Sequence, residues 1–145
     1  TRIAFKKTDV IQMLNGCIGG LVAVTAEPLM PSPLAAILIG AVGGIIVIYG
    51  TKFLLSIKID DVVGAIPAHL FAGIWGTLAV PITNPDANFG SQLLGVVSVN
   101  VFVFFVSFII WFLMKSTFGI RLSKDGETKG TDVTETGVIA YAIRD

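Results

Sequence analysis

The 145-residue chain contains little charge, one cysteine and one histidine. Charged residues make up 14% of it and hydrophobic residues 54%, whereas about a quarter of a typical globular chain is charged. Acidic and basic residues balance at ten each, so the net charge gives no support for binding to nucleic acid or to an acidic surface. The single cysteine, Cys17, cannot form an internal disulfide bond, and its apolar surroundings favour a packing role.

The sequence also lacks the common motifs of catalysis and cofactor binding. It has no Walker or dinucleotide-binding glycine motif, no CxxC and no HExxH. The only histidine, His69, has no serine or cysteine placed to act as its nucleophilic partner. We therefore expect neither enzymatic activity, nor a cofactor, nor a metal site.

Four long apolar stretches dominate the rest of the chain. They predict transmembrane helices at residues 8–27, 34–57, 61–82 and 91–115, since about 20 apolar residues span a bilayer. After residue 115 the composition becomes polar and charged, which predicts an extramembrane tail over residues 116–145. The expected fold is an all-α membrane protein with its membrane region at residues 1–115.

The lysines and arginines predict the orientation of these helices. Three precede the first predicted span, two lie at the junction of the second and third, and the remaining five lie at or beyond the end of the fourth. The other two loops contain none. By the positive-inside rule, both ends of this segment are cytoplasmic, in a multi-pass protein of the plasma or inner membrane.

The third predicted span carries the most informative polar residues. Two acids, Asp60 and Asp61, stand where this helix should begin. An aspartate there is typical of a helix N-cap, and Asp61 is alternatively a buried charge that shapes a conduction path. His69 lies about 12 Å further along a helix, near the middle of a hydrocarbon core of about 30 Å. An imidazole at that depth either bonds a neighbouring helix or serves a pore, and the cost of burying it favours the second role.

Pro67 and Trp75 each allow two interpretations. Pro67 either frees the carbonyl of Val63 and permits a kink, or simply fits the local helix geometry. Trp75 is either an interfacial aromatic residue or a packing residue. The Phe-rich fourth span, 91–115, is expected to face lipid or another subunit.

Small residues predict close contacts between helices. Two GxxxG pairs occur, Gly16 with Gly20 in the first span and Gly40 with Gly44 in the second. Such pairs usually mark tight helix packing in membranes.

Together these segments carry a family resemblance. DDVVGAIPAHLFAGIWG, at residues 60–76, resembles the signature of the ammonium transporter family (Amt/Mep/Rh). LNGCIGGLVAVTA, LAAILIGAVGGIIV and the tail GIRLSKDGETKGTDVTETGVIAY resemble further family segments and occur in the family's order. The resemblance covers nearly the whole chain.

The resemblance implies an architecture and a site. The family has eleven helices, two inverted five-helix halves plus a long last helix, and forms homotrimers with one hydrophobic pore per subunit. By resemblance this chain is its C-terminal portion, and we expect that it does not conduct alone. His69 matches the second of two pore histidines, Asp61 the acid at the start of that helix, and Ala65 a pore-wall position. The implied solute is ammonium or ammonia.

An ammonium sensor is the alternative function. In that case the same site binds ammonium, and the tail couples it to a cytoplasmic regulatory protein or a fused signalling domain. A kinase or cyclase after Asp145 would favour sensing, whereas a stop codon would favour transport. A structural bundle within some other transporter is a third alternative.

Overall fold

The computed structural model describes residues 1–139, and every regular element in that range is helical. The prediction of an all-α fold is confirmed, and the end of the family-like tail, with Tyr141, lies outside the described residues. In chain order the elements are α1 (Arg2–Phe5), α2 (Val10–Thr25), α3 (Pro33–Ser56), the π-helix η1 (Ile66–Phe71), α4 (Ala72–Thr83), α5 (Phe89–Thr117), α6 (Lys124–Lys129) and the π-helix η2 (Asp132–Thr136).

Within residues 1–139, three helical segments are long and apolar enough to cross a membrane. They are α3, the continuous segment Ile66–Thr83 formed by η1 and α4, and α5. The first predicted span corresponds to α2, which is apolar but only 16 residues long. Asp9 and Ser32 cap α2 and α3, each accepting a hydrogen bond from a backbone N–H in the first turn.

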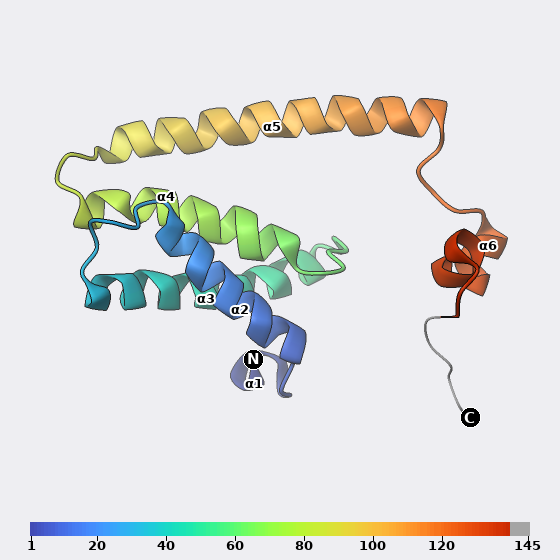
Figure 1. Ribbon diagram of the computed structural model, residues 1–145, viewed down its shortest axis with the longest axis horizontal. Helices are drawn as coiled ribbons and strands as arrows, with labels where there is room; N and C mark the ends of the chain where they lie inside the picture. Colours follow the sequence, from blue (N-terminus) through green and yellow to red (C-terminus); the bar gives the residue numbers. More distant parts are fainter. Residues whose placement is uncertain (140–145) are drawn as a thin grey trace. The chain divides into compact units, whose positions relative to one another are not determined.

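The chain divides into two compact units, Thr1–Asn100 and Val101–Asp145. In the first unit α2 packs against both α3 and the η1–α4 segment, which also contact each other (Figure 1). Apart from Leu54, the buried hydrophobic side chains of this unit are small or β-branched, which allows the helices to approach closely: Ala23, Ile39, Val47, Ala68, Ala72, Ala79 and Val80.

The contact between α2 and α3 is made by the predicted glycine pairs. Gly20 faces Gly40 and Gly16 faces Gly44, so the two helices run antiparallel. A Cβ atom on Gly20 would lie 3.0 Å from the carbonyl oxygen of Gly40, and one on Gly44 would lie 3.1 Å from that of Gly16. The prediction that these glycines serve tight helix packing is confirmed.

Trp75 belongs to the packed core of the first unit. Its indole Nε1 donates a hydrogen bond of 3.0 Å to the carbonyl oxygen of Ile39 on α3. Its ring packs against the cluster of Ala23, Ile39 and Ala79. Of the two interpretations of Trp75, packing is the one that this geometry supports.

The second unit contains the last part of α5 and the polar tail. The Arg121 guanidinium binds the Glu127 carboxylate through two hydrogen bonds, of 2.5 Å and 3.1 Å. This hydrogen bonding holds the pKa of the Glu127 carboxyl below its usual value and raises the pKa of Arg121. The short helix α6 is also capped by Ser123, whose hydroxyl accepts from the N–H of Gly126.

Candidate functional site

The segment with the two acids begins with a turn, and its helix starts later than the predicted residue 61. Residues 62–64 form this turn, and Gly64 has a φ of 74°, in the left-handed region that favours glycine. The Asp61 carboxylate reaches over the turn and accepts hydrogen bonds from the N–H groups of Ala65 (3.0 Å) and Ile66 (2.9 Å). Asp61 therefore caps the helix as expected, but the helix N-terminus that it caps lies about four residues later in the chain than predicted.

The carbonyl oxygen of Val63 accepts a hydrogen bond from a different helix. The side-chain Nδ2 of Asn15, on α2, donates to it over 2.7 Å. In the first interpretation of Pro67, its missing N–H frees this carbonyl inside a helix, but Val63 precedes the helix and so has no helical donor to lose. Pro67 lies in the first helical turn, where a missing N–H costs nothing, so its second interpretation, plain helix geometry, fits.

His69 lies in the π-helical turn η1, and its side chain is exposed. Within the described residues its imidazole has no hydrogen-bond partner. Turns of π-helix inside longer helices are rare and occur frequently at functional sites. Ala65, one turn before His69, is also exposed, while Asp61 is half-buried. The structure thus joins the Asp61 carboxylate to the backbone of Ala65, while within the described residues no hydrogen bond links the His69 imidazole to either.

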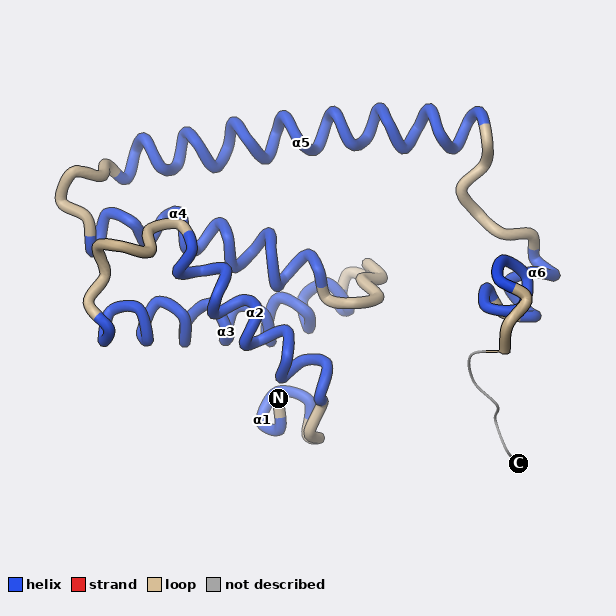
Figure 2. Tube along the Cα trace, in the orientation of Figure 1, coloured by secondary structure: helices blue, strands red, loops and turns tan. Residues whose placement is uncertain are grey.

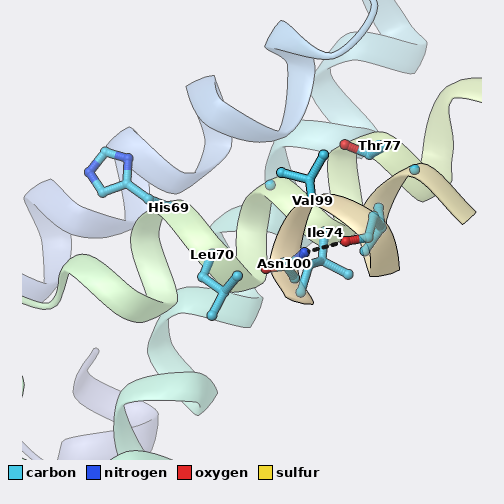
Figure 3. Close-up of a pocket in the computed structure, with 9 residues that line it drawn as sticks. His69, Leu70, Ile74, Thr77, Val99 and Asn100 are labelled. Carbon is cyan, nitrogen blue, oxygen red and sulfur yellow. Dashed lines mark hydrogen bonds between the residues drawn. The ribbon is translucent and has the colours of Figure 1, made fainter. Parts of the chain in front are cut away.

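An open groove of about 270 Å³ runs from His69 along the first unit, between the η1–α4 segment and the beginning of α5 (Figure 3). Most of its wall is apolar, and three polar side chains interrupt it. They come from η1, α4 and α5: His69, Thr77 and Asn100. In Figure 3 the imidazole of His69 points away from Asn100.

Two polar residues of this groove, Asn100 and Thr77, were not singled out from the sequence. The Nδ2 of Asn100 donates to the carbonyl oxygen of Val96 over 2.7 Å, drawn as a dashed line in Figure 3, and its side-chain oxygen stays available as an acceptor. The sequence does contain an indication of Asn100, because it places this amide inside a run rich in Val and Phe. Polar groups in such runs are costly, which is the argument that singled out His69.

The described residues contain no group of three or more His, Cys, Asp or Glu side chains that could hold a metal ion. The polar chemistry of the site is therefore that of one imidazole, one capping carboxylate and the uncharged groups around them.

The long apolar helices and their glycine-mediated contacts define a multi-pass membrane protein. A model of the Ammonium Transporter Family matches residues 1–141, and the chain belongs to that family. It is 33% identical to ammonium transporter Amt2 of Archaeoglobus fulgidus, over 93% of this chain and 33% of the relative. It is also 33% identical to ammonium transporter Amt1 of Haloferax mediterranei, over 93% of this chain and 27% of the relative. The chain therefore spans about a third or less of the length of these curated relatives.

Proposed function

We propose that the intact protein moves ammonium across a cell membrane as ammonia, and that His69 lines the path. Family membership and the names of the relatives, which are ammonium transporters, support transport over the alternative of sensing. The observation that carries the role of His69 is its exposed imidazole, without a hydrogen-bond partner in the described residues, beside an apolar groove.

The physical argument concerns the charge of the solute. An apolar passage excludes a bare cation because removing its water costs too much, whereas neutral ammonia passes. A neutral imidazole offers one hydrogen-bond donor and one acceptor. It can therefore bond ammonia in the passage, and it can accept or pass the proton that ammonium leaves behind.

Asp61 and Ala65 serve this path in different ways. The Asp61 carboxylate fixes the first turn of η1 and places a negative charge at that end of the helix. Ala65 offers a small side chain one turn before His69 and so leaves the passage open on that side.

The proposal also includes orientation and assembly. The lysines and arginines support cytoplasmic termini, a membrane region over residues 1–115 and a cytoplasmic tail over residues 116–145. The family resemblance supports a homotrimer, with the tail as the contact for other subunits or for a regulatory protein.

Flux through the purified protein tests the proposal. Lipid vesicles containing the intact protein are mixed with an ammonium salt, and the internal pH is followed with a trapped dye. Entry of ammonia consumes protons inside, so we expect the internal pH to rise faster than in vesicles that contain the same amount of an unrelated membrane protein. Equal rates in the two preparations would contradict transport.

A further inference from the structure

We propose that Asn15 is the residue that positions the helix turn carrying His69. The inference rests on the proposed function, because it gives Asn15 a role in the path that His69 lines. Asn15 lies on α2 and is 8% exposed, and it contacts neither His69 nor the groove of Figure 3. It acts through the turn before η1, whose residue Val63 accepts its hydrogen bond.

Within the described part of the chain, one side-chain hydrogen bond ties the turn before η1 to another helix, α2. The loop drawn in tan between α3 and η1 in Figure 2 follows Ser56 and leads into the helix at Ile66. Its backbone hydrogen bonds after Ser56 are local, to residues at the end of α3 or within the loop. Among the described residues, the bond from Asn15 Nδ2 to the Val63 carbonyl is the one that joins this loop to α2.

The first helical amides are satisfied by the turn itself. Asp61 accepts from the N–H groups of Ala65 and Ile66, Pro67 has no N–H, and Ala68 donates to the carbonyl oxygen of Gly64 over 3.2 Å. None of these bonds leaves the local segment. Ala68 of η1 packs against Val47 of α3, which fixes one side of this segment. The hydrogen bond from Asn15 holds the turn that leads into it, so we infer that Asn15 and this packing together set the direction in which η1 starts.

Asn15 and Gly64 also fit each other sterically. A Cβ atom on Gly64 would collide with the side-chain nitrogen of Asn15, and Gly64 is buried with a positive φ. The amide therefore fills the space that the missing side chain leaves. The hydrogen bond and the close packing together define one arrangement of the turn.

Gln12 provides a matched control. It lies one turn earlier on α2, is 9% exposed, and its side-chain oxygen accepts a hydrogen bond of 3.0 Å from the hydroxyl of Thr51 on α3. Both residues are buried amides on α2 that share a hydrogen bond with another segment, which is α3 for Gln12 and the loop before η1 for Asn15. Replacing Gln12 therefore shows how far flux falls when a buried amide is lost elsewhere on α2, through reduced stability alone.

The experiment compares Asn15→Leu, Asn15→Asp and Gln12→Leu in the intact protein. Leucine branches at the same carbon as asparagine but is larger and cannot donate, and aspartate donates only when protonated. We expect Asn15→Leu to lower flux per folded molecule by roughly tenfold or more, since small displacements of a reacting group have effects up to about 100-fold. Gln12→Leu should keep flux within about twofold of the original protein.

Relative to the original protein, the Asn15→Asp variant should regain flux as the pH falls, because the protonated carboxyl donates to Val63 again.

Hydrogen exchange of the Ala65 and Ile66 amides, measured without ammonium, separates this inference from the proposed function. Faster exchange in Asn15→Leu than in Gln12→Leu would support the positioning role, and equal exchange in the two variants would overturn it whatever the flux. If Asn15→Leu shows faster exchange but unchanged flux, Asn15 still holds the turn. In that case it is the role of His69 in transport that is overturned.

Discussion

Replacing His69 by alanine is expected to lower ammonium flux per molecule by roughly 5- to 150-fold. Leaving a buried polar partner unsatisfied costs about 1–3 kcal/mol, and each 1.36 kcal/mol added to a barrier is about a tenfold change in rate. The alanine variant offers the solute neither a donor nor an acceptor at that point of the path. The measurement is the rise of vesicle pH after addition of ammonium, at equal amounts of folded protein.

His69→Gln distinguishes the two ways in which the imidazole can act. A glutamine amide also carries donor and acceptor atoms, but it does not exchange a proton near neutral pH. If His69 only bonds the solute, the glutamine variant should retain much of the flux. If His69 handles the proton, the glutamine variant should resemble His69→Ala. Unchanged flux and solute selectivity in both variants would count against a pore role.

Replacing Gly76 by alanine is expected to destabilise the packing of α4 on α2 by about 1–3 kcal/mol. A Cβ atom on Gly76 would lie 2.8 Å from the Cα atom of Ala23 and even closer to its carbonyl oxygen. These are backbone atoms near the C-terminal end of α2, so neither helix relieves the contact by turning a side chain. The helices must move apart, and the protein should unfold at a lower temperature.

Gly73→Ala is the matched control for this prediction. Gly73 lies one turn earlier on the same helix, and a Cβ atom there would be 3.8 Å from the nearest methyl group of Val22, an ordinary contact. The measurement is the thermal unfolding midpoint of each variant in detergent. Equal midpoints for the two variants would show that the approach of α4 to α2 at Gly76 contributes nothing to stability.

Much of the fold follows from local sequence patterns. Long apolar runs predict the helices, since a bilayer sets their length, and GxxxG spacing predicts which faces of α2 and α3 meet. The pairing of Gly16 with Gly44 and of Gly20 with Gly40 follows once two such helices lie antiparallel. His69 also stands out from the sequence, because a lone imidazole within an apolar run is costly.

The start of the third helical segment could not be predicted in the same way. Asp61 predicts a cap, but the pattern does not reveal that its carboxylate caps Ala65 and Ile66 across a turn. The turn depends on Gly64, whose positive φ is a backbone property, and on Asn15, which lies 48 residues away from its partner in sequence. Hydrogen bonds over such separations leave no periodic signal.

An experimental structure of the intact protein in lipid tests the central proposal most directly, by identifying what lies within hydrogen-bond distance of His69. We predict a second histidine facing it across a narrow apolar passage that continues the groove beside η1 and α4. A backbone carbonyl in a closed, fully packed interface beside the imidazole would contradict the account, because it would make His69 a structural residue with no path for ammonia.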